Sequence, residues 1–230
     1  MNILAIDCAC DVLSVALAAG IETFYTEIDA GVRHSELLME CADTLCKTAG
    51  ISPGELSLVA CMKGPGSFTG LRIGYSATKG IAMALGIPFR PVPTMECLAY
   101  RLSIWPGMAL PAIDAKRGCF FAALYRNGKE LAGCMDAPPE AIAEKIAWAR
   151  LSKDEQVVLT GPGAELLYPR LKTHLPGGLV RVDPDCRKGR ARELLEIAGS
   201  RLSEEISDID SGPVYIRKSD AEEKSIAQGR

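Results

Sequence analysis

The sequence predicts an α/β protein built from two lobes of the same architecture. Three observations support this prediction. First, the expected elements follow the order βββαβαβα twice along the 230 residues. Second, the tripeptide Ala-Ile-Asp ends the first strand of each half, at Asp7 and at Asp114. Third, Gly-Pro-Gly follows the fourth strand of each half, at 64–66 and at 161–163. Matching tripeptides at equivalent places in two matching orders indicate an internal duplication.

The first half alternates between the hydrophobic periods of strands and helices. Short apolar or alternating runs predict strands, and apolar residues three and four positions apart predict helices. We therefore expect strands at 2–7, 13–19, 21–27 and 56–62, and helices at 34–47, 67–85 and 94–102.

The second half repeats this pattern from residue 108. We expect strands at 108–114, 118–125, 129–134, 156–160 and 179–182, and helices at 139–150, 164–173 and 190–206. Pro139 falls in the first turn of its helix, where its missing N–H leaves no helical hydrogen bond unmade.

Three antiparallel strands extended by parallel βα units form a mixed sheet with helices on its faces. Two such lobes enclose a cleft, which is the ribonuclease-H-like duplication of the actin-like ATPase (ASKHA) superfamily. We place the lobes at 1–104 and 105–206. The segment from about 207 to 230 could pack on the first lobe, and the final helix could also cross back to it.

Composition narrows the classes of function. Apolar residues make up 48% of the chain and charged residues 24%, as in ordinary globular proteins. The net charge of −3 and the pI of about 5.6 argue against an extended basic surface for nucleic acid.

Charged residues, Pro or Gly interrupt every apolar run, so no membrane-spanning helix is expected. The 9 cysteines, with no secretory leader before them, favour a reducing cytoplasm. With no C-x-x-C pair and only 2 histidines, a zinc site is not expected.

The most specific stretch is G-P-G-S-F-T-G-L-R-I-G at 64–74. Its glycines free the backbone for a tight turn, and Ser67 is the expected N-cap of the following helix. The stretch is neither a P-loop nor a nucleophile elbow. A Gly-rich loop before a helix can bind anions, but on local grounds we favour a tight turn with a capped helix. The turn residues are Gly64, Pro65, Gly66, Ser67, Thr69 and Arg72.

Several motifs together closely resemble the bacterial TsaB family. They are Ile3–Asp7, Arg33–Leu38, Gly64–Gly74, Lys79–Ala82 and Pro213–Arg217. The resemblance covers the whole chain, is strongest over 1–100, and rests mostly on element order from 108 to 211. TsaB is the small paralogue of TsaD, the subunit that transfers threonylcarbamoyl to the tRNA adenosine next to the anticodon. The resemblance implies that this chain serves that modification as a non-catalytic partner subunit.

The resemblance also implies a partner surface. In TsaB relatives the two helices of the first lobe join the matching pair of TsaD in a four-helix interface. We therefore expect this chain to form a heterodimer with TsaD. It should contact TsaE and tRNA only through that complex, and it should form a homodimer when TsaD is absent. Glycines inside the second helix cost ~1 kcal/mol each relative to Ala, which indicates close approach of another helix or of the lobe's own sheet. The expected contact residues are His34, Leu37, Leu38, Cys41, Leu45, Phe68, Gly70, Leu71, Gly74, Tyr75 and Thr78.

Catalytic residues and cofactors are not expected. In the catalytic paralogue an H-x-x-x-H metal pair occupies the places that Thr94 and Leu98 take here, so the resemblance implies no metal. The hairpin at 7–11 has no Gly, Ser or Thr to hold a phosphate, and its Asp11 would repel one. Asp7 and Asp114 could face each other across the cleft, but we favour each capping its own turn through nearby amides. The alternatives are an actin-like small-molecule kinase or ATPase and, less favoured, a metallopeptidase.

Overall fold

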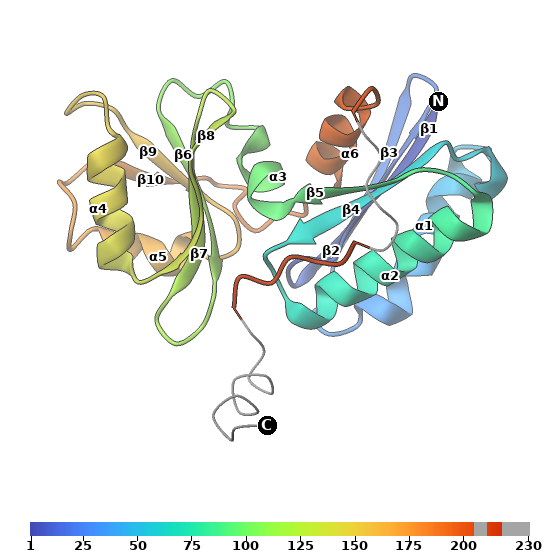
Figure 1. Cartoon of the computed structure of the whole chain (residues 1–230), viewed down its shortest axis with the longest axis horizontal. Helices are drawn as coiled ribbons and strands as arrows, with labels where there is room; N and C mark the ends of the chain where they lie inside the picture. The colour runs from blue at the N-terminus through green and yellow to red at the C-terminus, as the bar shows by residue number, and fades with distance from the viewer. Residues whose placement is uncertain (205–210, 218–230) are drawn as a thin grey trace.

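The computed structural model contains two five-stranded mixed sheets with helices packed on their faces (Figure 1). This arrangement confirms the predicted α/β class. The structure describes residues 1–204 and 211–217. The end of the last predicted helix, at 205–206, and positions 207–210 and 218–230 of the segment predicted to pack on the first lobe lie outside the described residues. Within the described part of the chain, no helix is long and apolar enough to cross a membrane.

The first sheet has the strand order β3-β2-β1-β4-β5. The first three strands pair antiparallel, and β4 and β5 extend the sheet in parallel. Helices α1 and α2 pack on one face of this sheet, and α3 leads toward the second lobe (Figure 1). The bounds are β1 Asn2–Asp7, β2 Val12–Ala19, β3 Glu22–Asp29, α1 His34–Thr48, η1 Pro53–Glu55, β4 Leu58–Gly64, α2 Phe68–Leu85, β5 Phe89–Pro93 and α3 Thr94–Tyr100.

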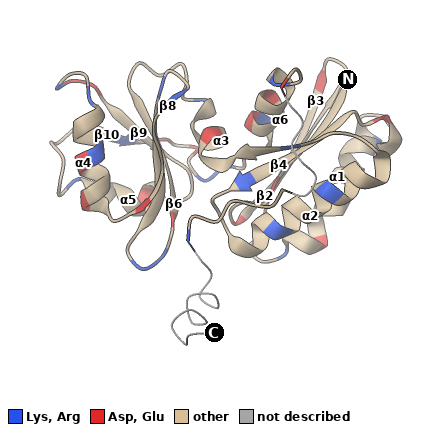
Figure 2. Ribbon diagram, viewed as in Figure 1, with Lys and Arg blue, Asp and Glu red and all other residues tan. Residues whose placement is uncertain are grey.

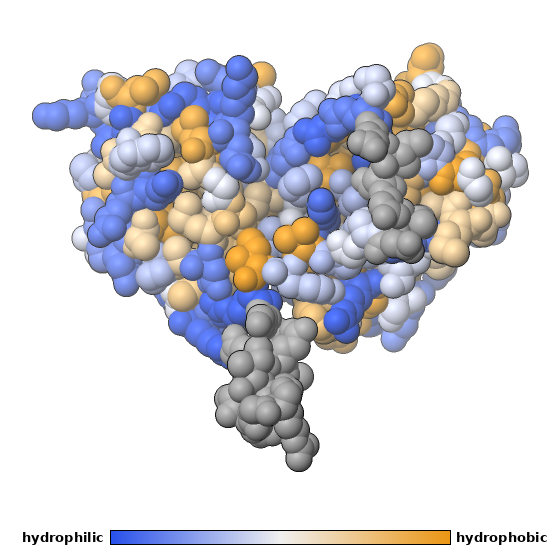
Figure 3. Space-filling model, viewed as in Figure 1, coloured by the Kyte–Doolittle hydropathy of each residue, from blue (hydrophilic) through white to orange (hydrophobic). Residues whose placement is uncertain are grey.

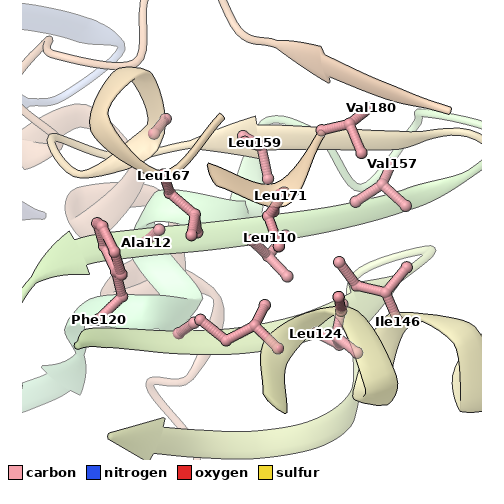
Figure 4. Close-up of a cluster of buried hydrophobic side chains, with 14 of the residues drawn as sticks. Leu110, Ala112, Phe120, Leu124, Ile146, Val157, Leu159, Leu167, Leu171 and Val180 are labelled. Carbon is pink, nitrogen blue, oxygen red and sulfur yellow. The ribbon is translucent and has the colours of Figure 1, made fainter. Parts of the chain in front are cut away.

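The second sheet repeats this topology as β10-β9-β6-β7-β8. Its core is apolar, with side chains from β6, β7 and β9 meeting those of α4 and α5 (Figure 4). The matching strand orders support the internal duplication inferred from the tripeptides. The bounds are β6 Met108–Asp114, β7 Phe120–Arg126, β8 Lys129–Ala137, α4 Pro139–Ala149, β9 Val157–Thr160, α5 Ala164–Leu171 and β10 Val180–Val182.

Strand β5 had no residue range in the sequence prediction, although the predicted order required a strand there. Pro91 and Pro93 interrupt its pattern, because proline cannot donate to a sheet ladder. The strand lies at the edge of the sheet, where a missing donor is tolerated.

Helix α6 (Ala191–Ser200) crosses back and packs on the first sheet, on the face opposite α1 and α2 (Figure 1). Its buried residues Leu194 and Ile197 join Ile3 and Ala5 in one apolar cluster. This return, which the sequence left open, covers the second face of the first sheet. The lobe boundaries at 1–104 and 105–206 stay predictions.

Glycines let α2 lie directly against the hairpin that follows β1. A Cβ atom at Gly70 would overlap the carbonyl oxygen of Cys8, and one at Gly74 would lie 3.2 Å from the Cβ of Cys8. At Gly80, by contrast, a Cβ would meet no atom of the described chain within 4 Å. Two of the three helix glycines therefore serve packing inside the lobe, whereas Gly80 faces solvent.

This difference predicts opposite effects of alanine at two sites of one helix. We expect Gly70→Ala to lower the free energy of unfolding by about 1–3 kcal/mol, because the new methyl group overlaps the backbone. Gly80→Ala should raise it by roughly 0.5–1 kcal/mol, because alanine is the better helix former. Urea unfolding followed by circular dichroism measures both changes. A loss of stability at Gly80, or none at Gly70, would contradict the packing described.

Candidate functional site

A cleft between the lobes contains three adjoining cavities, and Figure 3 shows hydrophobic residues gathered where the lobes meet. The inner cavity, of about 240 Å³, is lined by residues that include Asp7, Leu98 and Arg190. The middle cavity, of about 480 Å³, includes Ser67 and Asp114. The outer cavity, of about 340 Å³, lies at the other end and is lined by Pro65, Gly66, Phe68, Ala115, Lys116, Arg117, Phe121 and residues 214–217.

Asp7 ends β1 and is buried, with 5% of its surface exposed. Its Oδ1 accepts the N–H of Ala9 at 3.0 Å, and its Oδ2 accepts the N–H of Arg190 at 2.9 Å and the hydroxyl of Ser14 at 3.5 Å. Burial raises the pKa of this carboxyl above its usual value, although the hydrogen bonds and the Arg190 charge oppose the shift. Protein donors thus occupy the oxygens that a metal ion would need.

Asp114 ends β6, at the place equivalent to Asp7. Its Oδ1 accepts the N–H of Lys116 at 2.8 Å, and its Oδ2 accepts the Lys116 ammonium at 2.9 Å. Partial burial acts to raise the pKa of Asp114, but the hydrogen bonds from Lys116 outweigh it and the pKa is lowered. Asp7 lines the inner cavity and Asp114 the middle one. Both carboxylates make the turn hydrogen bonds that the sequence favoured, and they do not share a cavity.

Thr94 and Leu98, where the resemblance implied the lost metal ligands, both have structural contacts. The hydroxyl of Thr94 accepts the N–H of Gly64 at 3.2 Å. Leu98 packs in an apolar cluster that joins α3 to Ala109 and Ile113 of the second sheet. Among residues 1–204 and 211–217, no group of three His, Cys, Asp or Glu is placed to hold a metal ion.

Cys8, Cys61 and Cys97 are buried thiols of the first lobe. Burial is the main cause that raises the pKa values of Cys8, Cys61 and Cys97. A raised pKa keeps a cysteine in its unreactive thiol form. These residues therefore act as small apolar side chains, as their number and spacing suggested.

The Gly64–Gly74 motif joins α2 to the hairpin after β1. The Ser67 hydroxyl accepts the N–H of Gly70 at 3.2 Å, which confirms the predicted N-cap. The N–H of Ser67 donates to the carbonyl of Ala9 at 2.7 Å, so it is not free for an anion. Thr69 and Arg72 lie exposed on the first turns of α2, and Pro65 is buried. These contacts support a tight turn with a capped helix.

The predicted partner residues divide by the side of the helix on which they lie. Leu37 is half-buried, and Phe68 is exposed at 39%. The others make their contacts inside the first lobe. These buried residues are His34, Leu38, Cys41, Leu45, Gly70, Leu71, Gly74, Tyr75 and Thr78. Helical spacing identified the apolar stripe, and that stripe packs on the lobe's own sheet.

The outward face of α2 carries small and apolar residues that sequence reasoning did not select. The exposed ones are Ser76, Gly80, Met83 and Ala84, and they recur three and four positions apart, beside half-buried Ile73 and Ala77, which also pack against the first-lobe core. On the neighbouring α1, Met39 is 52% exposed, and on α2 Met83 is 71% exposed. We call these two outward surfaces the outer helix face. In the sequence, the feature that could have indicated this face was the pair Gly80 and Ala84, small residues that lie off the buried apolar stripe.

Comparison with known proteins gives a consistent result. The chain matches the family described as "TsaD: tRNA N6-adenosine threonylcarbamoyltransferase" over residues 28–225. It is 30% identical to the Escherichia coli (strain K12) "tRNA threonylcarbamoyladenosine biosynthesis protein TsaB", over 97% of this chain and 98% of that protein. It is 36% identical to the Bacillus subtilis (strain 168) protein of the same description, over 56% of this chain and 57% of that protein.

A solved structure shares the fold. The structure described as "YeaZ from Pseudomonas aeruginosa" matches with a TM-score of 0.79 at 24% sequence identity, covering 94% of this chain and 99% of that one. The match extends over both lobes, so the two-lobed α/β architecture is common to both proteins.

The two cleft carboxylates predict opposite pH dependences. The folded-state pKa of Asp7 is raised, so its contribution to stability is greatest below its usual value of 3.8 and falls as the pH rises through the raised pKa. The folded-state pKa of Asp114 is lowered, so its contribution is present above 3.8 and is lost as the pH falls through the lowered pKa.

The measurement is the urea midpoint of the wild type relative to Asp7→Asn and to Asp114→Asn, from about pH 3 to 7. The difference in urea midpoint between the wild type and Asp7→Asn should shrink with rising pH. The difference between the wild type and Asp114→Asn should grow. Slopes of the same sign would contradict the two environments described.

Proposed function

This chain belongs to the TsaB family of tRNA threonylcarbamoyladenosine biosynthesis proteins, and we therefore propose that it is the non-catalytic partner subunit of a tRNA threonylcarbamoyltransferase. In this proposal it forms a heterodimer with TsaD, the subunit that modifies the adenosine next to the anticodon. Together the two subunits bind TsaE. The chain works in the cytoplasm and meets tRNA only through the complex.

The observation that carries this proposal is the outer helix face. Its α2 part is small and apolar, and a Cβ atom at Gly80 would meet no atom of the described chain within 4 Å. Small side chains let the backbone of a partner helix approach closely, and apolar residues form the centre of most stable protein interfaces. We propose that this face, with Leu37 and Phe68 at its margin, contacts TsaD. The buried residues that the sequence predicted for this interface instead pack α1 and α2 onto the first sheet.

The cleft supports a non-catalytic role. Backbone amides and Ser14 already bind the Asp7 oxygens, and Thr94 and Leu98 are used in packing. A kinase would need free amides for phosphate, whereas the Ser67 N–H is bonded to Ala9. Figure 2 shows basic residues interspersed with acidic ones over both lobes, which favours a tRNA contact made mainly by the partner.

The test is size-exclusion chromatography with light scattering, on this chain alone and mixed with TsaD from the same organism. We expect a one-to-one complex that Gly80→Arg weakens at least about tenfold, because a long charged side chain would enter the interface centre. Arginine is also a better helix former than glycine, so unfolding would not explain the loss. Substitution of Gly74 or Leu38 would be less informative, because both residues pack inside the lobe.

Gly177→Arg is the matched control, because Gly177 in the second lobe also has open space around its Cβ position within the described structure. It should leave the complex intact. No complex with wild-type protein, with ATP and TsaE present or absent, would refute the proposal. Equal binding by Gly80→Arg would refute the location of the surface. ATP hydrolysis by the isolated chain would instead favour the kinase or ATPase alternative.

A further inference from the structure

Residues 211–217 form an extended strap that runs beside α2 and reaches the second lobe at the mouth of the cleft (Figure 1). The strap lines the outer cavity together with Phe68 from the first lobe and Phe121 from the second. It contains the Pro213–Arg217 motif, to which the proposed function assigns no role.

The first half of the strap is bound to the first lobe. The N–H of Val214 donates to the carbonyl of Lys63 at 2.7 Å. At Gly64, where φ is +107°, a Cβ atom would lie 2.5 Å from the carbonyl oxygen of Val214. Only glycine therefore lets the strap approach this closely. The hydroxyls of Ser211 and Tyr75 lie 3.1 Å apart, within hydrogen-bond distance.

Tyr215 adds an aromatic contact to the first turns of α2. Its ring centroid lies 5.0 Å from that of Phe68. Arg72 lies over the Phe68 ring at 3.8 Å, and its Nε donates to the Tyr215 hydroxyl at 3.1 Å. The strap is thus held to α2 by a tilted aromatic contact, by the Arg72 guanidinium at 5.8 Å from the Tyr215 ring and by a hydrogen bond.

The other end of the strap is bound to the second lobe. Arg217 makes a bidentate ion pair with Asp136 on β8, with Nε–Oδ2 and Nη2–Oδ1 distances of 2.7 and 2.6 Å. Its Nη1 donates to the carbonyl of Ala115, just after β6, at 2.7 Å. Both side chains of the pair are largely buried, with 23% and 20% exposed. One arginine side chain therefore joins two segments of the second lobe to the first.

At the inner end of the cleft, the two lobes are in apolar contact through α3. There α3 packs through Met95 and Leu98 on Ala109 and Tyr125 of the second sheet. Apolar contact is non-directional and tolerates small rotations, whereas a bidentate ion pair requires one geometry. At the α3 end the lobes also meet through Arg101, just after α3, which pairs with Asp183 and Asp185 beyond β10. The strap adds a bidentate pair at the opposite end of the cleft.

We propose that residues 211–217 act as a clasp that holds the two lobes closed over the outer cavity, and that release of Arg217 from Asp136 lets the lobes rotate about α3. The clasp also touches Phe68 and Arg72 at the start of α2. A partner that covers this end of the helix would therefore meet Tyr215 as well. The clasp itself does not depend on the proposed function, because it can be tested on the isolated chain.

The test is hydrogen–deuterium exchange and small-angle X-ray scattering of the full chain carrying Arg217→Ala. We expect exchange at Val214 and in the turn at 115–119 to accelerate at least about tenfold, because hydrogen bonds to charged groups are among the stronger ones in proteins. The radius of gyration should increase as the lobes open. Arg217→Lys keeps the charge without the bidentate geometry and should give an intermediate result.

The control is Arg126→Ala, which removes a bidentate pair with Glu155 inside the second lobe, at 2.6 and 2.9 Å. It should accelerate exchange near Glu155 and leave the strap and the radius of gyration unchanged. The double variant Arg217→Asp, Asp136→Arg should restore slow exchange. The clasp is refuted if Arg217→Ala leaves exchange at Val214 unchanged. It is also refuted if the strap exchanges faster while the radius of gyration stays constant.

Discussion

The close contact between α2 and the hairpin after β1 determines much of the rest of the structure. The glycines at 66, 70 and 74 bring the helix against the backbone of Cys8 and Ala9. This contact fixes the direction of α2 on the sheet and engages the Ser67 N–H with the hairpin carbonyl. It also turns Gly80 and Met83 outward. The same packing therefore engages one amide of the turn and presents the outward surface of α2.

The segment between β10 and α6, which crosses back from the second lobe, makes two contacts with the first lobe. It places the Arg190 N–H on Asp7 and starts α6, which covers the second face of the first sheet. The oxygens of Asp7 are therefore engaged by hydrogen bonds from the fold itself, from Ala9, Ser14 and Arg190. The first sheet is thus covered on one face by α1 and α2 and on the other by α6.

The sequence was sufficient to predict the duplication, the two mixed sheets and the Ser67 cap, because these follow from local periods and local hydrogen bonds. It did not locate β5, where prolines at a sheet edge hide the strand pattern. It also left open which lobe α6 joins, since long-range packing decides that. At the candidate surface, apolar spacing selected the inward stripe of α1 and α2. Only the structure distinguishes Gly70, where an added Cβ would overlap Cys8, from Gly80, where it would meet no atom of the described chain within 4 Å.

The most direct test of the central claim, that the outer helix face is the partner surface, is hydroxyl-radical footprinting of the complex with TsaD. Met39 and Met83 are reactive side chains on that face, exposed at 52% and 71%, and Trp148 on α4, exposed at 71%, is an internal reference. The account predicts that TsaD protects both methionines from oxidation and leaves Trp148 unchanged. Protection of Trp148 with both methionines still oxidised would contradict it.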